Sequence, residues 1–338
     1  MSDDGQKPDS EEILDHASGV RASDAVNEAH QEELEKPLIE DVSSDVAPTV
    51  QEFIAEASVA NQAAGLEAAQ ESAFHAGAGF AAAEFASEKV PPFIAFEDVN
   101  KSFGEFVVLK DVSFYVNTGE TMCILGRSGV GKSVSLQMLM GFLKPDSGTV
   151  LVAGQDIAGL SEGEMQDVRR KVTMVFQNGA LFDSITVGEN VAFPLRERGD
   201  MEEDQILQVV KGLLEMVGVA GMENMLPSDL STGMKRSVAI ARALAAQPSA
   251  ILYDEPTTMV DPLMAHLLGD LIQRLKMQMH LTSIVVTHDM RFAEKLADRL
   301  VFLHEGSVRF FGTTAEMRAS DDPVLKEFFS MDDLVVPV

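Results

Sequence analysis

One glycine-rich segment in the middle of the chain has the residue types of a phosphate-binding loop. In order, it consists of Gly126, Arg127, Ser128, Gly129, Val130, Gly131, Lys132 and Ser133. Its glycines permit close backbone approach, so successive N–H groups and a following helix N-terminus can point at an anion. Lys132 would then bridge the β- and γ-phosphates of a nucleotide, and Ser133 would offer its hydroxyl to Mg²⁺. We therefore expect a nucleoside triphosphate and Mg²⁺ to bind here.

Two neighbouring carboxylates follow an apolar run further along the chain. Asp254 and Glu255 come directly after residues 250–253, which we expect to form a buried strand. Their side chains would emerge at the carboxyl edge of the sheet, where open α/β folds bind ligands. Hydrolysis needs one carboxylate near the metal and another facing the attacking water. The pair therefore suits a hydrolytic site.

Three more features form an ordered set with the loop and the carboxylates. Gln177 follows an apolar run at 172–176, and His288 follows another at 283–287. Between them, a segment of helical pattern begins with Leu230, Ser231, Thr232, Gly233 and Met234. The order and spacing of these motifs resemble those of the ATP-binding subunits of ABC transporters.

The resemblance implies a role for each matched residue. Asp254 would hold Mg²⁺ through water, and Glu255 would orient and deprotonate the attacking water. Gln177 would contact Mg²⁺ and the same water, and the loop after it would touch a membrane subunit. His288 would contact the γ-phosphate of ATP, and Phe103 would stack on the adenine. The resemblance thus predicts an ATPase that uses Mg²⁺.

The resemblance also implies a head-to-tail dimer of two copies of the chain. Ser231 and Gly233 lie in the signature motif, at a helix N-terminus that completes the ATP site of the opposite copy. Asp261 would lie in the loop that crosses the dimer interface. Two departures put the rate of hydrolysis in question: Thr232 replaces a glycine, and Met259 stands where the family prefers glycine or serine.

A further stretch narrows the subclass of transporter. Residues 176–187 and 189–197 resemble the ATPases of Mce/Mla-type systems, which move phospholipids between bacterial membranes. This implies a membrane permease and a lipid-binding substrate protein as partners, and a peripheral location on the cytoplasmic face of the inner membrane. Amino-acid or methionine importers have related sequences here, and a regulatory ABC subunit with weak hydrolysis is another alternative. The resemblance covers about residues 93–328.

An α/β domain must position these residues, and the resemblance implies a P-loop ABC-type ATPase with a RecA-like core, an antiparallel β subdomain and a helical subdomain. The β-rich runs that predict the antiparallel layer lie at 93–96, 107–109 and 112–116. The apolar strands expected in a sheet covered on both faces lie at 121–125, 172–176, 250–253 and 283–287. A helix is expected at 131–143. The insertion at about 178–245 predicts the helical subdomain, because apolar residues from Ile206 to Val217 have helical spacing.

The composition sets limits on the partners. The chain has 54 acidic and 26 basic residues and a formal net charge of -28, which argues against binding a nucleic-acid duplex. No run of about 18 or more apolar residues is present, and the start of the chain lacks the features of a secretory signal, so we expect a cytoplasmic protein. The single cysteine, Cys123, lies in the apolar run before the phosphate loop. We expect it to be a buried structural residue.

Residues 1–92 are expected to form a separate acidic extension, with 20 acidic and 4 basic residues. Up to about Pro48 the segment is polar and is expected to be disordered. A capping pattern at Thr49 and Glu52 and an alanine-rich stretch to Phe85 predict marginal helices. The aromatic residues that could anchor a partner, or be chance members of a solvated tether, are Phe53, Phe74, Phe80 and Phe85. We expect the domain to fold without residues 1–88, and residues 329–338 to form a C-terminal tail.

Overall fold

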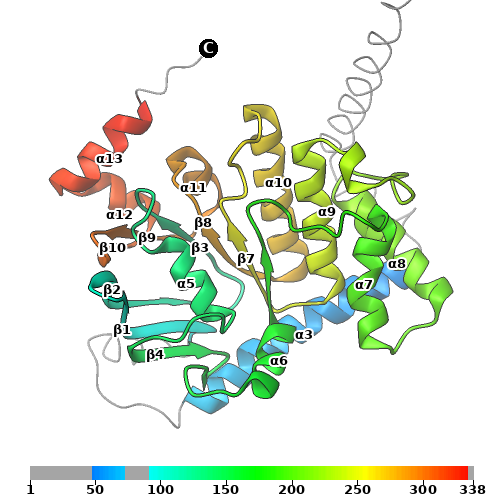
Figure 1. Cartoon of the computed structure of the whole chain (residues 1–338), viewed down its shortest axis with the longest axis horizontal. Helices are drawn as coiled ribbons and strands as arrows, with labels where there is room; N and C mark the ends of the chain where they lie inside the picture. The colour runs from blue at the N-terminus through cyan, green and yellow to red at the C-terminus, as the bar shows by residue number, and fades with distance from the viewer. Residues whose placement is uncertain (1–47, 73–90, 334–338) are drawn as a thin grey trace, which may run out of the picture.

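The computed structural model describes residues 48–72 and 91–333 of the chain. These residues fold into two β-sheets with surrounding helices (Figure 1). One sheet is mostly parallel and carries the predicted site residues at its strand ends. The other is antiparallel and lies beside it. A group of helices extends from the parallel sheet on the side away from the antiparallel sheet. Within these described ranges, no helix combines the length and the apolar character needed to cross a membrane.

The larger sheet has six strands in the order β10-β9-β3-β8-β7-β6. The bounds are β3 Thr121–Leu125, β6 Val172–Val175, β7 Ala250–Asp254, β8 Thr282–Val286, β9 Arg299–His304 and β10 Ser307–Gly312. All neighbouring pairs are parallel except β9 and β10, which form an antiparallel hairpin. The four predicted core strands are confirmed to within one residue at their ends. The strands β9 and β10 were not predicted.

Both faces of this sheet are buried, as its continuously apolar strands predict. In β3, Met122 and Ile124 pack into one apolar cluster, whereas Cys123 and Leu125 pack into the other. Successive side chains of a strand point to opposite faces, so a strand covered on both sides buries both sets of side chains. Cys123 is fully buried and unpaired, as expected, and burial raises the pKa of its thiol.

The smaller sheet is antiparallel, with the order β2-β1-β4-β5. Its strands are β1 Ile94–Phe103, β2 Phe106–Val116, β4 Ser147–Val152 and β5 Gln155–Asp156. The runs predicted separately at 107–109 and 112–116 form one strand, β2, with an irregularity between them. Asp111 has a positive φ of 48° there, and the register with β1 shifts between Val112 and Leu109. The sheet therefore bends without ending.

The helical subdomain lies in the predicted insertion at about 178–245. Its helices are α7 Val187–Arg198, α8 Glu203–Met216 and α9 Thr232–Ala245, with a short 3₁₀ turn at Pro227–Asp229 before α9. The predicted apolar stripe of α8 is buried, including Ile206, Leu213 and Leu214. These helices pack in the same apolar cluster as one face of the parallel sheet, so α9 lies against the core.

The remaining helices after the phosphate loop are α5 Lys132–Leu139, α6 Glu162–Lys171, α10 Pro262–Met279, α11 Met290–Leu296, α12 Thr314–Ala319 and α13 Pro323–Asp333. The helix expected at 131–143 ends early as α5, where Gly141 takes a positive φ of 69°. The expected tail at 329–338 is wrong in its first part, because α13 continues across residue 328 to Asp333.

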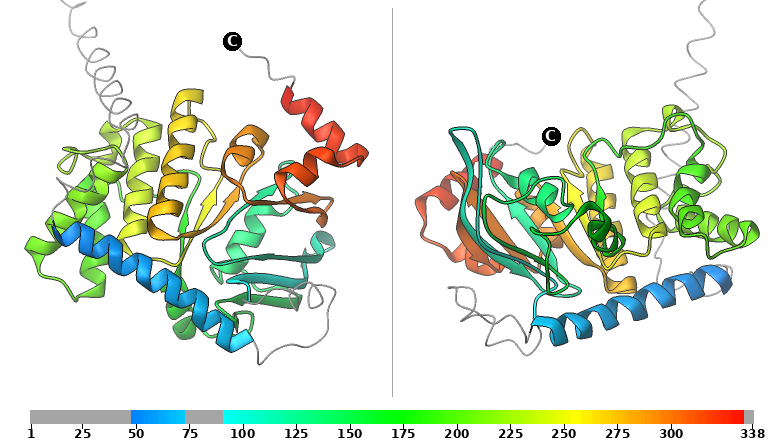
Figure 2. Two further views of the ribbon diagram at one scale, coloured as in Figure 1. Left: turned by 180° about the vertical axis from the view of Figure 1, so that it is seen from behind. Right: turned by 60° about the horizontal axis from the view of Figure 1, so that its bottom comes forward.

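The predicted boundary at residue 92 requires a correction. Residues Pro48–Ser72 form one helix, α3, which lies across the side of the molecule from the helical subdomain toward the antiparallel sheet (Figure 2). Val50, Phe53 and Ala57 are buried against the domain, so the solvated tether is wrong for this segment. Gly65, within the alanine-rich stretch, lies inside this helix. The predictions of disorder before Pro48 and of anchoring by Phe74, Phe80 and Phe85 lie outside the described residues.

Candidate functional site

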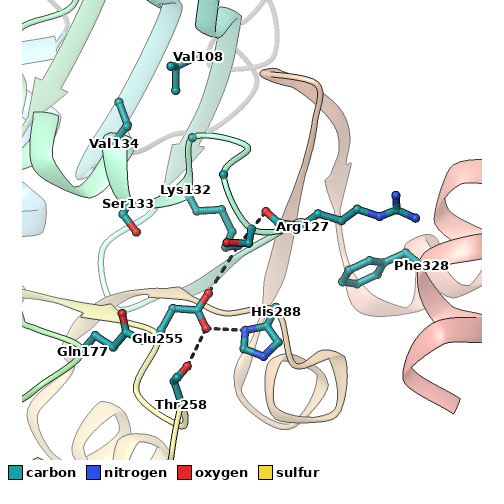
Figure 3. Close-up of a pocket in the computed structure, with 13 residues that line it drawn as sticks. Val108, Arg127, Lys132, Ser133, Val134, Gln177, Glu255, Thr258, His288 and Phe328 are labelled. Carbon is teal, nitrogen blue, oxygen red and sulfur yellow. Dashed lines mark hydrogen bonds and ion pairs between the residues drawn. The ribbon is translucent and has the colours of Figure 1, made fainter. Parts of the chain in front are cut away.

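A cavity of about 860 Å³ opens at the carboxyl ends of the parallel strands. Of the predicted site residues, it is lined by Arg127, Ser128, Gly129, Gly131, Lys132, Ser133, Gln177, Glu255 and His288. These residues come from the phosphate loop and from the ends of three different strands. The fold therefore brings together positions up to about 160 residues apart in sequence (Figure 3).

Two glycines of the phosphate loop occupy positions that no other residue fits. Gly126 has a φ of 151°, and a Cβ there would lie 2.5 Å from the carbonyl oxygen of Leu303 in β9. Gly131 has a φ of 103°, and its Cβ would lie 2.5 Å from Cδ2 of Leu109 in β2. The loop is thus held between strands of both sheets. This close packing aims the N-terminus of α5, with its positive dipole end, into the cavity.

Lys132 is buried at the base of the cavity with several oxygen partners. Its ammonium donates to the carbonyl oxygens of Gly126 at 2.8 Å and Arg127 at 3.1 Å, and lies 3.6 Å from Oε1 of Glu255. Burial lowers the pKa of Lys132, and the neighbouring carboxylate of Glu255 acts in the opposite direction. A buried ammonium with three donors can exchange a carbonyl for a phosphate oxygen, which offers a stronger, charge-assisted bond.

Asp254 and Ser133 present oxygen atoms side by side. The hydroxyl of Ser133 donates to Oδ1 of Asp254 at 3.0 Å, and Gln177 lines the same cavity. Burial raises the pKa of Asp254, and this effect exceeds the opposing effect of the bond from Ser133. A hydroxyl, an amide oxygen and one carboxylate together suit Mg²⁺, because this ion usually keeps several water ligands and takes others from the phosphates of its substrate. No group of three or more acidic, histidine or cysteine ligands occurs in the described ranges, so a site holding a metal by protein alone is not found there.

Glu255 connects three side chains at the centre of the cavity. Its Oε2 lies 2.6 Å from Nδ1 of His288 and accepts a 3.2 Å hydrogen bond from the hydroxyl of Thr258 (Figure 3). The backbone is fixed as well: Glu255 has a positive φ of 48°, and its N–H donates to the carbonyl of Val286. A carboxylate held at both oxygens and beside the phosphate loop can orient a water and accept its proton.

Three predicted site residues lie at helix N-termini outside this cavity. Ser231 is the N-cap of α9 and accepts a hydrogen bond from the N–H of Met234, and Asp261 is the N-cap of α10 and accepts one from the N–H of Met264. At Gly233, a Cβ would lie 2.7 Å from Cε of Met264. The two helix N-termini are therefore packed together, and none of the three residues lines the cavity beside the phosphate loop.

The lining of the cavity also lacks four of the predicted site residues, Gly126, Val130, Phe103 and Asp254. The first two belong to the loop, and Asp254 is joined to the lining through Ser133. Phe103 lies at the end of β1, exposed, with the ammonium of Lys101 5.6 Å from its ring centroid. Its stacking on adenine stays a prediction.

The cavity also contains residues that were not predicted. Val108, Val134, Thr258 and Phe328 line it, and Phe328 comes from α13 at the far end of the chain. Glu327 pairs with Arg127 of the phosphate loop at 2.7 Å, so α13 lies beside that loop. No local pattern in the sequence around residue 328 indicates this position, whereas Thr258 follows the acidic pair closely enough to have been considered.

Comparisons with known proteins agree with this geometry. Residues 109–258 match the family model described as ABC transporter. The chain is 42% identical to the protein TRIGALACTOSYLDIACYLGLYCEROL 3, chloroplastic, of Arabidopsis thaliana, over 68% of this chain and 71% of that protein. It is 40% identical to the intermembrane phospholipid transport system ATP-binding protein MlaF of Haemophilus influenzae, over 67% and 85%. The methionine import ATP-binding protein MetN of Rhizobium johnstonii also matches at 40%, over 66% of this chain and 60% of that protein.

A solved structure supports the same assignment. The dimeric ATP-binding cassette MJ0796, in a post-hydrolysis state with ADP and phosphate, superimposes with a TM-score of 0.60. The two are 32% identical, and the match covers 65% of this chain and 98% of that one. The phosphate loop, Glu255 and the strand-end histidine meet in one cavity within the matched fold, and Asp254 is hydrogen-bonded to Ser133 of its lining. This chain belongs to the ABC transporter family as an ATP-binding subunit, and it is an ATPase.

Proposed function

We propose that this subunit hydrolyses Mg²⁺-ATP in a head-to-tail dimer and thereby drives phospholipid transport through a membrane permease. The observation that carries the hydrolytic part is the bonding of Glu255 to both His288 and Thr258 beside the phosphate loop. The observation that carries the lipid part is the similarity to two relatives named for lipid systems, over two thirds of the chain.

The chain's own residues divide the work of hydrolysis. Lys132 and the loop N–H groups bind the β- and γ-phosphates, because they form a rigid cluster of donors at a helix N-terminus. Glu255 orients the attacking water and accepts its proton, while His288 holds the carboxylate in place and faces the γ-phosphate. Ser133, Asp254 and Gln177 would hold Mg²⁺, which when bound neutralises charge on the phosphate oxygens.

A second copy of the chain would complete the site. Ser231, Gly233 and Asp261 lie at the packed N-termini of α9 and α10, outside the cavity of their own chain. Such N-termini offer unpaired N–H groups to an anion on another surface. Met259, 91% exposed and with a positive φ of 62°, projects from the loop before α10 and would contact the other copy.

The permease would dock on the helical subdomain near Gln177. Phe182 and Phe193 are exposed there, and their ring centroids are 5.2 Å apart. The guanidinium of Arg242 lies 5.7 Å from the ring of Phe182. A pair of exposed aromatic rings beside an arginine is typical of an interface core. This surface supports attachment of the ATPase through its partner, and the location that we propose is the cytoplasmic face of the inner membrane.

The substrate class can be tested on the native assembly. The complex is purified through a tag on this chain, and its proteins and bound lipids are identified by mass spectrometry. The proposal predicts an integral membrane permease, a lipid-binding substrate protein and co-purified phospholipid. A complex that contains an amino-acid-binding protein, and whose ATPase rate rises with methionine and not with phospholipid, would instead support the importer alternative.

A further inference from the structure

The helix α3 joins the far ends of the two helices that begin with the proposed interface residues. The side-chain amide of Asn61 donates to the carbonyl oxygen of Met279, the last residue of α10, at 2.8 Å. The amide of Gln247, just beyond α9, donates to the carbonyl oxygen of Phe53 at 3.0 Å. The side chain of Asn61 is 1% exposed, so its bond to α10 is made in the interior. One helix thus holds the ends of both α9 and α10.

A movement at one end of α9 or α10 shifts its other end, because each is a single continuous helix. At 1.5 Å per residue, α9 spans about 21 Å and α10 about 27 Å. The helix α9 begins at Thr232, directly after Ser231, and α10 begins directly after Asp261. If either helix tilts at the end that α3 holds, the distance between the signature motif and Asp261 at the opposite ends changes.

Two further contacts hold α3 to the helical subdomain. Val50 packs so closely on α8 that a Cβ at Gly212 would lie 2.6 Å from Cγ1 of Val50 and 2.7 Å from its Cγ2. The buried ring of Phe53 lies below the guanidinium of Arg198, 5.9 Å from the ring centroid, at the end of α7. The helix α3 therefore bridges the end of α10 and the helical subdomain, and both views in Figure 2 show it running along them.

We propose that α3 is a positioning element that sets the orientation of the signature helix α9 relative to α10, and so controls dimer closure on ATP. This inference rests on the proposed head-to-tail dimer. The cavity that binds ATP in a single chain has no residue of α3 in its lining, so the affinity of the separate chain for ATP does not depend on α3. Closure of the dimer does depend on α3, because a loosened pair of α9 and α10 must be ordered again before the second copy can bind.

The close contact at Gly212 allows a test with an internal rescue. In Gly212→Ala, the new methyl group collides with the rigid, β-branched side chain of Val50, so α3 must move away from α8. Val50→Ala removes the two methyl groups that cause this clash and leaves only its Cβ, at 3.1 Å, so the double variant should let α3 dock again with a small shift. Alanine has the higher helix propensity, so Gly212→Ala should not weaken α8 itself. Val59→Ala, at a 66% exposed position of α3, is the matched control.

The purified full chain is measured in three ways for each variant: ATP affinity, ATP turnover at saturating ATP, and ATP-dependent dimerisation in a Glu255→Gln background. Hydrogen exchange of residues 49–64 reports whether α3 is docked. We expect Gly212→Ala to expose α3 to exchange, to lower turnover and dimerisation about five- to tenfold, and to leave ATP affinity within twofold. The double variant should recover most of the turnover, and Val59→Ala should match the parent.

Two results would overturn the inference. Turnover and dimerisation equal to the parent, with α3 undocked in hydrogen exchange, would mean that α3 has only a structural role. Faster turnover on undocking would mean that α3 restrains closure and does not prepare it. A parent chain that binds ATP but neither dimerises nor hydrolyses it would count against the proposed function instead, so the two failures are distinguishable.

Discussion

Nδ1 of His288 lies 2.6 Å from Oε2 of Glu255 across the floor of the cavity. The two residues end adjacent parallel strands, and the N–H of Glu255 is bonded to Val286 of the neighbouring strand. The histidine therefore fixes one oxygen of the carboxylate while Thr258 donates to the same oxygen. The other oxygen faces Lys132 at 3.6 Å.

Removal of this imidazole should loosen the carboxylate without removing it. We expect His288→Ala to lower turnover about 10- to 100-fold, since small displacements of a reacting group are costly to the rate. ATP affinity should change less than turnover. Phosphate release and equilibrium ATP binding, measured on the same preparation, check this. An unchanged turnover would show that Glu255 is positioned without His288.

Lys132→Ala should act on binding, in contrast to His288→Ala. Loss of a buried ammonium removes charge-assisted bonds of about 1.5–3 kcal/mol from the phosphates, which corresponds to roughly 10- to 150-fold weaker ATP binding. Isothermal titration with ATP measures the change, and a melting curve establishes that the variant is folded. Retained ATP affinity in a folded Lys132→Ala protein would contradict the assignment of the phosphate loop.

Asp254→Asn should stabilise the nucleotide-free protein while it weakens Mg²⁺-dependent turnover. Burial raises the pKa of Asp254 above the usual value of 3.8, so the folded state holds this proton more tightly than the unfolded state does. The parent therefore loses stability as pH rises through the folded pKa, whereas the uncharged amide of the variant has no such loss. The melting temperature of Asp254→Asn relative to the parent should increase as the pH rises from below 3.8, the usual pKa, through the raised pKa of the folded state. A constant difference across that range would contradict the raised pKa.

Truncation should destabilise the domain once it removes α3. Val50 and Phe53 are nearly fully buried, and each contributes about 1.5–3 kcal/mol of apolar burial. Deletion of residues 1–72 should therefore lower the melting temperature by several degrees. Calorimetry of the truncated and full chains provides the comparison. Equal melting temperatures would support the tether that the sequence suggested.

Local patterns were sufficient to predict the strands and motifs of the core. The apolar run at 121–125 followed by glycines and Lys132 defines a strand, a turn and a helix start within a dozen residues, and all three are present. The hairpin of β9 and β10 has a weaker local signal, a glycine between two short β-rich runs, and it was not predicted. Its turn residues Glu305 and Gly306 both have positive φ, as two-residue hairpin turns require.

The docking of α3 could not be predicted in the same way. Its buried face meets Gly212 in α8 and the carbonyl of Met279 in α10, which lie 150 or more residues away. The sequence of α3 is mostly alanine and polar residues, so it has no strong apolar stripe to suggest burial. The position of Phe328 beside the phosphate loop is a similar case, because a distant helix supplies one ring to the cavity.

The role of Glu255 is the central claim, and Glu255→Gln tests it most directly. Phosphate release and ATP-dependent dimerisation are measured together on the parent and on this variant. The amide keeps the shape of the side chain but cannot accept a proton from water, so we expect turnover to fall about 10²- to 10⁴-fold while ATP binding is retained and the ATP-bound dimer accumulates. Hydrolysis by Glu255→Gln at the parent rate would contradict the account, because another group would then have to activate the water.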